Sequence, residues 1–499
     1  SAAEYNRIFN EKHSLNGLMV YTMRQEKKGI ANDLQLSLPN RNMGLSGRLA
    51  YNFDTRYFAE FNFGYNGSER FSKNNRWGFF PSVGMAWMIS NEKFFRPLTS
   101  RITQFKLKAT YGLVGNDAIG SNNDRFYYLS QVEMNASRNV NWGTQLGYNP
   151  GGINVSRYAN DKIGWEKAYK TNVGAEIVLN NGLSANIDLF HEKRENILLD
   201  RVLPATMGVI PAVKANLGKA SGKGIDIEMN YEKSINSHLW ITGRGTFTYA
   251  TSKADEWEEP DYAGTPWLSR VGQSLSQTWG YIAERLFIDD SEVKNSPAQI
   301  GKYMAGDIKY RDVNRDGKIS ELDKVPIGFP TTPEINYGFG LSVGYRGFDG
   351  SFFFQGSARQ SFWLDLAKIT PFLDGNSDDG LTGHNAILQV FADNYWSENN
   401  RDAYALWPRL ANYTVDNNNQ TSTWFMQDAS FLRLKSVELG YTIPREIINR
   451  IHLQNLRFYV SGTNLLCFSS FKLWDPEMAG NGLGYPVQRV FNIGLNIGI

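Results

Sequence analysis

The sequence has little that would point to a soluble enzyme or a secreted disulfide protein. It holds one cysteine, Cys467, so an internal disulfide is excluded. Its net charge of +2 gives no electrostatic basis for binding nucleic acid. No apolar run approaches the roughly 18 residues that a membrane helix needs, and the opening SAAEYNRIFNEK has no signal-peptide core. Aromatic residues are plentiful instead, at 14%, which is typical of β-structure, and 47 glycines allow close approaches between backbones.

The C-terminal segment VFNIGLNIGI alternates strictly between two kinds of residue. Phe491, Ile493, Leu495 and Ile497 share one face, whereas asparagine and glycine occupy the other. A period of two predicts a β-strand, and about nine residues is the length of a tilted strand that crosses a bilayer. We therefore predict that these four side chains face lipid.

The same alternation recurs along the chain and predicts about fourteen long strands. The predicted ranges are 13–28, 40–53, 56–71, 78–91, 102–116, 164–179, 183–199, 223–233, 238–253, 334–345, 348–363, 431–443, 456–469 and 490–499. The face opposite the apolar residues carries polar, small or charged residues such as Arg48, Glu60, Glu176 and Asp188. Alternation alone fits either a soluble sheet or a membrane barrel, because both have one apolar face.

The lengths of the connections separate these two possibilities. Short connections at 54–55, 180–182, 234–238 and 346–350 alternate with long ones at 117–163, 200–222, 254–333, 364–430 and 470–489. Bacterial outer-membrane barrels have short periplasmic turns and long extracellular loops. The fold class predicted for residues 1–499 is therefore all-β, a transmembrane antiparallel β-barrel in the outer membrane, with 254–333 and 364–430 as extracellular loops.

One of these loops contains the segment DVNRDGKISELD, which has the spacing of an EF-hand calcium loop. The six ligand positions are Asp312, Asn314, Asp316, Lys318 (through its carbonyl), Ser320 and Asp323, and Gly317 stands where the loop turns sharply. We expect a structural Ca²⁺ ion that holds the loop in one shape. The alternative is an acidic turn without a metal.

The long loops are also rich in aromatic residues. These are Trp257, Trp267, Trp279, Trp363, Tyr395, Trp396, Tyr404, Trp407 and Trp424. Flat aromatic faces in exposed loops stack on sugar rings or become buried against a partner protein. Docking of a partner is the favoured interpretation of this set, and stacking on a glycan is the second.

Several segments, in order along the chain, resemble the SusC/RagA type of TonB-dependent transporter. They include RWGFFPSVGMAWMISNEKFF (76–95), FKLKATYGLVGN (105–116), GDIKYRDVNRDGKI (306–319), FLRLKSVELGYTIP (431–444) and LRFYVSGTNLLCFS (456–469). The resemblance implies a 22-stranded barrel closed by an N-terminal plug. It also implies a SusD-like surface lipoprotein as a lid and energy from TonB-ExbB-ExbD. No plug or TonB box is recognisable here, so we expect the chain to be the C-terminal portion of such a barrel.

The function that this resemblance implies is active import of oligomeric nutrients across the outer membrane, with oligosaccharides favoured over oligopeptides. No catalytic role is expected, because none of the five histidines lies at metal-ligand spacing from another and no nucleophile-elbow motif occurs. Two alternatives remain. One is a passive fourteen-stranded porin, and the other is an outer-membrane enzyme with its residues at one rim.

Overall fold

A computed structural model describes residues 1–27, 29, 37–119, 125–136, 141–208, 212–372, 374–376, 382–448 and 453–498. Ile499 therefore lies outside the described residues. The chain divides into two compact units. The first comprises Ser1–Asp226, Thr251–Pro260 and Arg270–Gln273, and the second comprises Ile227–Ala250, Asp261–Ser269 and Ser274–Ile499. Long antiparallel strands dominate both units.

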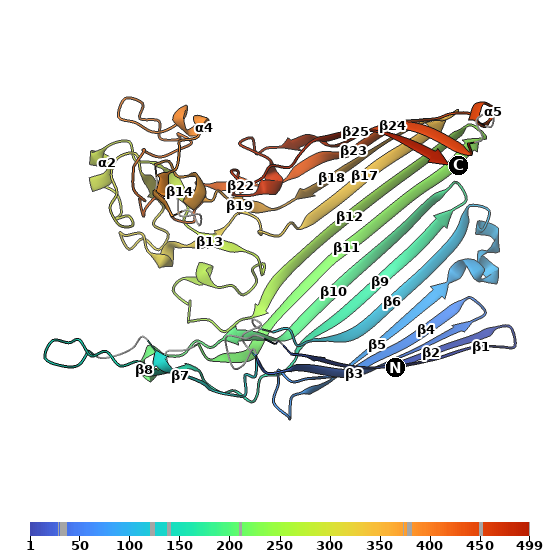
Figure 1. Cartoon of the computed structure of the whole chain (residues 1–499), viewed down its shortest axis with the longest axis horizontal. Helices are drawn as coiled ribbons and strands as arrows, with labels where there is room; N and C mark the ends of the chain where they lie inside the picture. The colour runs from blue at the N-terminus through green and yellow to red at the C-terminus, as the bar shows by residue number, and fades with distance from the viewer. Residues whose placement is uncertain are drawn as a thin grey trace. The chain divides into compact units, whose positions relative to one another are not determined.

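In the first unit, successive strands pair with their neighbours in chain order (Figure 1). These strands are β1 (Ala2–Phe9), β2 (His13–Glu26), β3 (Asn40–Phe53), β4 (Tyr57–Ser68), β5 (Trp77–Met88), β6 (Ile102–Asn116), β9 (Glu166–Leu179) and β10 (Leu183–Asp200). A small separate hairpin of β7 (Gln131–Ala136) and β8 (Gly152–Arg157) lies in the connection between β6 and β9. The connection between β5 and β6 contains the short 3₁₀ helices η1 (Ile89–Asn91) and η2 (Lys93–Leu98).

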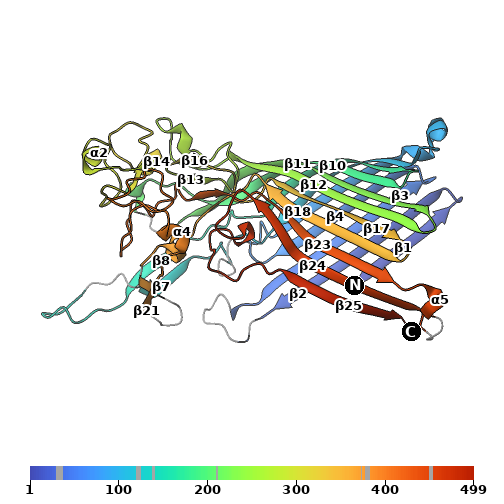
Figure 2. The same cartoon turned by 90° about the horizontal axis from the view of Figure 1, so that it is seen from above.

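The second unit continues the same up-and-down pattern (Figure 2). Its long strands are β17 (Ile335–Tyr345), β18 (Phe348–Ala358), β23 (Phe431–Thr442), β24 (Asn455–Ser469) and β25 (Val490–Gly498). The residues of β11 (Lys214–Asn236) and β12 (Leu239–Glu256) are divided between the two units. All these strands belong to one 15-stranded sheet whose order follows the chain from β1 to β25.

All fourteen predicted strands are present, and the structure adds β1 as a fifteenth. The segment Ala2–Phe9 was missed because Arg7 interrupts its apolar alternation, and its pairing with β2 is made by the backbone. The structure also begins β11 at Lys214, nine residues before the predicted start at Lys223. The glycines and lysines of 214–224 have low strand propensity, and pairing with neighbouring strands overrides it.

The tight turns form where the sequence places them. The 180–182 turn has Gly182 at φ +94°, a conformation open mainly to glycine. In the turn between β17 and β18, Gly347 has φ +86°, and a side chain there would meet the carbonyl of Thr442 at 2.7 Å. The turn from β3 to β4 instead has Asp54 and Thr55 both at φ +52°, the backbone of a two-residue hairpin.

The two faces of the strands differ in exposure, as the alternation of the sequence predicts. Along β4 the outward residues Tyr57, Phe61 and Tyr65 are exposed, whereas Phe58 and Glu60 on the other face are half-buried. Phe491, Ile493, Leu495 and Ile497 on β25 are likewise exposed, and Ile493 reaches 87%. An apolar face that stays exposed along many strands is expected where lipid, not protein, covers it.

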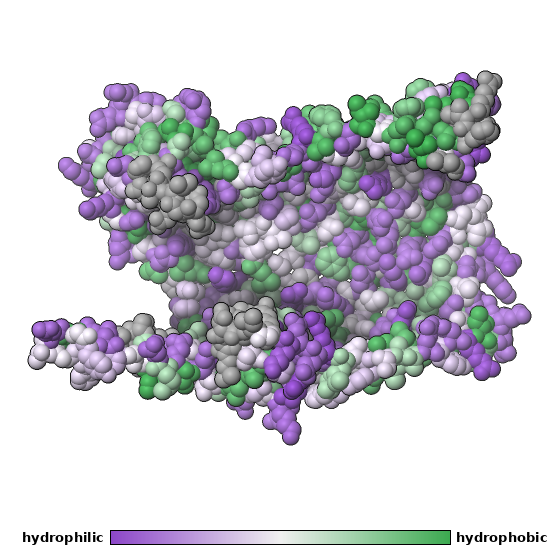
Figure 3. Space-filling model, viewed as in Figure 1, coloured by the Kyte–Doolittle hydropathy of each residue, from purple (hydrophilic) through white to green (hydrophobic). Residues whose placement is uncertain are grey.

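The opposite face carries the charges, and they are paired. In the first unit Arg48 contacts Glu60 at 2.7 Å, and Lys108 contacts Asp188 at 3.1 Å. Figure 3 shows hydrophilic side chains gathered over the middle of β9 and β10. A lumen-facing wall with paired charges agrees with the predicted polar face. Among the described residues, no helix is long and apolar enough to cross a membrane.

Candidate functional site

The connections between β12 and β17 and between β18 and β23 fold together in the second unit. We call residues 274–334 and 359–430 the loop domain. Its described residues contain four short strand pairs: β13 (Thr278–Gly280) with β16 (Val325–Ile327), β14 (Ala283–Leu286) with β15 (Ile308–Tyr310), β19 (Ser361–Trp363) with β22 (Met426–Asp428), and β20 (Asp374–Asn376) with β21 (Thr382–His384). A parallel bridge between Tyr281 and Ser422 joins the two connections directly.

A hydrophobic core holds the loop domain together. Its buried members include Tyr281, Leu286 and Ile308 from the first connection, and Phe391 and Trp407 from the second. Figure 3 shows hydrophobic side chains clustered in the region that Figure 1 labels β14, with hydrophilic ones around them. Loops with their own core keep a defined surface shape, which a binding site requires.

Hydrogen bonds between buried polar groups determine how the two connections pack against each other. Asn417 is fully buried, donates to the carbonyl of Ile308 at 2.6 Å and accepts from the amide of Ile300 at 3.2 Å. The Tyr310 hydroxyl donates to the Asn417 carbonyl at 2.7 Å. Because these contacts satisfy buried polar groups, other relative positions of the two connections would leave some of them unpaired.

A buried ion pair lies beside this network. Asp307 is fully buried and contacts Arg409 Nε at 2.8 Å, and it also accepts from the Asn418 side chain and the Met304 amide. Burial raises the pKa of Asp307, and the Arg409 guanidinium opposes that rise. The pair therefore joins the two connections to each other.

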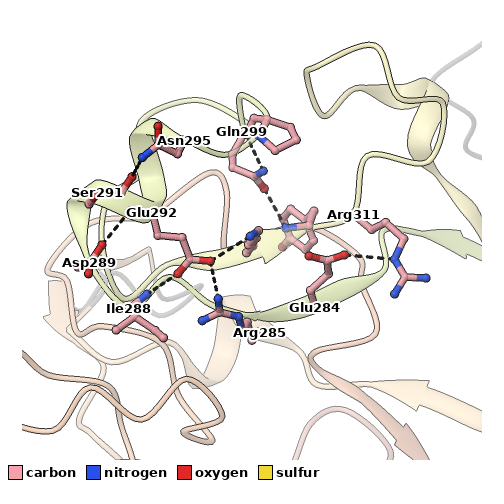
Figure 4. Close-up of polar contacts among 12 residues, drawn as sticks. Glu284, Arg285, Ile288, Asp289, Ser291, Glu292, Asn295, Gln299 and Arg311 are labelled. Carbon is pink, nitrogen blue, oxygen red and sulfur yellow. Dashed lines mark hydrogen bonds and ion pairs between the residues drawn. The ribbon is translucent and has the colours of Figure 1, made fainter.

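A second charged cluster surrounds Glu292, which lies in the short helix α2 (Asp290–Lys294). Glu292 accepts from Arg285 at 2.8 Å and from Lys309 at 2.9 Å, and from the amide of Ile288 at 3.1 Å (Figure 4). Burial would raise the pKa of Glu292, but these three donors together keep it below its usual range. Asp289 caps the helix by accepting from the Glu292 amide. The cluster therefore stabilises the β14–β15 edge of the loop domain.

The predicted calcium loop forms a compact turn. Asp312 accepts from the amides of Asp316 and Gly317, Asn314 Oδ1 accepts from Asp316, and Asp316 Oδ1 accepts from Lys318. Gly317 has φ +86°, as the sharp bend at that position requires. The side chains at the first three ligand positions therefore turn inward on one another.

The last position of that motif has a structural role. Asp323 accepts from the amides of Val313 and Ser320 at 2.8 Å each, and with Ser320 it forms a capping box on the 3₁₀ helix η5 (Glu321–Asp323). Within the described residues, no group of three or more His, Cys, Asp or Glu side chains is arranged to hold a metal ion. A cation here would depend on Asp312 and Asp316 together with the Asn314 amide and the Lys318 carbonyl.

The structure corrects part of the aromatic prediction. Trp396 and Trp407 are each only 5% exposed, so they belong to the core of the loop domain and cannot dock a partner or a sugar. Trp424 and Tyr395 pack against the same core. The sequence prediction failed here because it treated these segments as loops without a core of their own.

The other predicted aromatics differ in their exposure. Trp267 donates to the Leu322 carbonyl, Trp279 to the Trp267 carbonyl and Trp363 to the Ser422 carbonyl, so all three support the loop backbone. Trp257, in the first unit, is half-buried. Tyr404 alone of the nine is strongly exposed, at 71%. Tyr404 is therefore the member of the set best placed to contact a partner or ligand.

The sequence prediction missed an exposed apolar surface on the first unit. The hairpin of β7 and β8, with the described part of the segment between these strands, exposes Met134, Trp142, Leu146, Tyr148 and Ile153, each by 58–69%. Figure 1 shows it extending beyond the ends of β6 and β9. The sequence signal that could have revealed this surface is the presence of large apolar residues in a connection that is otherwise rich in asparagine and glycine. Such a surface on a protruding hairpin is typical of a contact with another protein.

The polar face of the strands contains a large hollow in the first unit. It has a volume of about 590 Å³, and its charged lining residues are Arg48, Glu60, Lys106, Lys108 and Lys170. In contrast, the cavity beside Trp407, Arg409 and Tyr413 in the loop domain measures only about 30 Å³, which is room for roughly one water molecule. Space for a larger solute therefore lies along the strands.

Comparison with known proteins identifies the family. Residues 5–465 match the model described as TonB dependent receptor-like, beta-barrel. The chain is 26% identical to TonB-dependent receptor P3 of Formosa agariphila over 90% of its length and 45% of that protein. It is 25% identical to TonB-dependent receptor SusC of Bacteroides thetaiotaomicron over 96% of its length and 46% of that protein.

Solved structures agree on the fold. The RagAB peptide transporter superposes with a TM-score of 0.72 at 22% identity, over the whole of this chain and 55% of that one. The chain thus spans about half the length of the relatives it matches. Its paired-charge face, its exposed apolar face and its long folded loops are those of an outer-membrane barrel, and the chain belongs to the TonB-dependent receptor-like β-barrel family.

Proposed function

We propose that this chain is the barrel portion of an outer-membrane importer of oligomeric nutrients. The observation that carries the proposal is the match to TonB-dependent receptors such as SusC over 96% of the chain. Oligosaccharides are favoured over oligopeptides, although RagAB, with a similar fold, is a peptide transporter. The energy would come from TonB-ExbB-ExbD, acting through a plug supplied by the remainder of the protein.

In this proposal the residues described above provide a wall and a docking surface and perform no covalent chemistry. The polar face, with pairs such as Arg48–Glu60 and Lys108–Asp188, would line the path of a hydrated solute. The loop domain and the β7–β8 hairpin would receive a SusD-like surface lipoprotein that covers the path from outside. The exposed apolar residues of the hairpin support this part of the proposal.

Uptake in living cells separates this proposal from a passive porin. Cells that carry the protein should take up a labelled oligosaccharide only while the TonB system and the proton gradient are intact. Peptides of the same size serve as the comparison that assigns the cargo class. Uptake that persists without TonB would contradict the importer and support the porin, because a passive pore needs no energy.

We also propose that the turn of residues 312–323 binds one Ca²⁺ ion. The support is the inward arrangement of Asp312, Asn314 and Asp316 around a glycine at positive φ. The ion would neutralise the acidic side chains and stabilise the loop domain, as oxygen ligands at this spacing do elsewhere. Calcium is abundant outside the cell, so even a weak site would be filled.

Removal of calcium should loosen the loop domain and leave the strands intact. We expect chelation to speed protease cleavage within residues 274–334 severalfold, and added Ca²⁺ to restore protection. Asp312→Ala should be cleaved quickly with or without the chelator, whereas Asp290→Ala, on the exposed start of α2, should behave like the original protein. Equal cleavage rates of the original protein with and without chelator would show that the turn holds no metal.

A further inference from the structure

A second hollow lies on the outward face of the strands in the first unit. Its volume is about 420 Å³, and the side chains that matter here are His191 of β10, Ser221 and Lys223 of β11, and Thr251 and Lys253 of β12. Neither the wall of the transport path nor the loop domain makes use of this group. Its residue types, two lysines, a histidine and two hydroxyl residues, are those that bind an anionic oxygen group.

The alternation along the strands places this hollow on the lipid side. On β10 the outward residues Ile187 and Leu189 are followed two residues later by His191. On β12 the outward set runs from Ile241, which pairs with the apolar Val343, through Tyr249 to Thr251 and Lys253. Thr251 lies next to Lys223, because its hydroxyl donates to the Lys223 carbonyl. Each strand therefore changes from apolar to basic or hydroxyl residues at this level.

The change occurs toward the long connections. β10 runs from the 180–182 turn to its end at Asp200, and β12 runs from the short turn at 237–238 to Glu256. Since long connections lie outside the cell in this class of barrel, the hollow lies where the outer edge of the apolar band meets the lipid headgroups.

The positive charge of the hollow is only partly neutralised. Lys253 contacts Asp255 at 3.4 Å, and its side chain is 58% exposed. Lys223 is exposed and forms no ion pair with any of the described residues. Of the neighbouring lysines, Lys193 is paired with Glu195 and Lys219 with Glu256. The ammonium groups of Lys223 and of Lys253, which has a single long ion-pair contact, are therefore available as hydrogen-bond donors at the membrane surface.

We propose that this hollow binds a phosphate group on the headgroup of an outer-leaflet lipid. Two ammonium groups and the Ser221 hydroxyl can donate to the oxygens of a phosphate monoester, and the outward apolar residues Ile187 and Leu189 of β10 match the acyl chains beneath it. The continuity between the lipid-facing band and the hollow favours a lipid over a free anion. The bound headgroup would fix the depth at which this part of the barrel lies in the membrane.

The test measures binding of diphosphoryl lipid A to the protein purified from native outer membranes in mild detergent. A lysine near an anionic membrane surface changes affinity by about fivefold, so Lys223→Gln combined with Lys253→Gln should weaken binding about 25-fold. Lys302→Gln removes one exposed charge from a loop of the second unit and is the matched control, with no expected change. Heat-modifiable migration on gels verifies that each variant forms its strands.

Three outcomes decide the proposal. Selective weakening in the double variant, together with poor binding of dephosphorylated lipid A, supports it. Equal affinity of the double variant and the original protein for lipid A overturns it, as does equal binding of the phosphorylated and dephosphorylated lipids. Displacement of lipid A by equimolar inorganic phosphate also overturns it, because the site would then be one for a free anion.

Discussion

Replacing Asp307 with alanine should destabilise the loop domain by about 3–5 kcal/mol, the usual cost of removing one partner of a buried ion pair. Asp307 is fully buried, and without it the Arg409 guanidinium, which is only 12% exposed, would keep its charge with no carboxylate beside it. The Met304 amide and the Asn418 side chain would lose an acceptor in the same step. We expect the two connections to separate while the long strands remain folded.

Limited proteolysis at increasing urea concentration measures this effect. Cleavage within residues 274–334 and 359–430 should occur at much lower urea in Asp307→Ala than in the original protein. Glu284→Ala is the matched control, because the Glu284–Arg311 pair of Figure 4 is largely exposed and should contribute about 0–1 kcal/mol. If the two variants were cleaved alike, the buried pair would not hold the connections together.

Introducing arginine at Ile493 should impair assembly of the protein into membranes. Ile493 is 87% exposed in the middle of β25, on the apolar face. Placing arginine at the midplane of a bilayer costs about 2–4 kcal/mol on the lipid-facing side of a barrel. A loss of this size, in a strand with nine residues, should reduce the folded fraction severalfold.

The neighbouring position provides the control for this substitution. Asn492 lies on the opposite face of the same strand and pairs across to Ser461. Arginine at 492 would face the polar side, where charges are already found, so folding into liposomes should be close to normal. The measurement is the fraction that gains heat-resistant migration after dilution into liposomes. Equal folding of Ile493→Arg and Asn492→Arg would show that this face of β25 is not in lipid.

The fourteen predicted strands could be recognised because the alternation of apolar and polar residues lies within each strand. The alternation of Phe491, Ile493 and Leu495 needs no information from another part of the chain, and neither does the turn at Gly182. The strand β1 lacked such a pattern, and only its pairing with β2 shows it. Local periodicity determines strand identity as long as one face must be apolar.

The candidate site was predictable only in part. The spacing of Asp312, Asn314 and Asp316 predicted a tight turn, and the hydrogen bonds of that turn are present. The same motif could not show that Asp323 would be used to cap η5. Whether the turn binds calcium stays a prediction.

By itself, the sequence determined the strands, their two faces and the alternation of short and long connections, because each of these depends on residues close together in the chain. Tertiary structure alone decided that Trp396 and Trp407 form a core, and that Asn417 contacts Ile308, 109 residues away. It also decided which lysines on the outward face form ion pairs and which, such as Lys223, form none with the described residues. Burial and pairing depend on neighbours that folding brings together, and no local pattern records them.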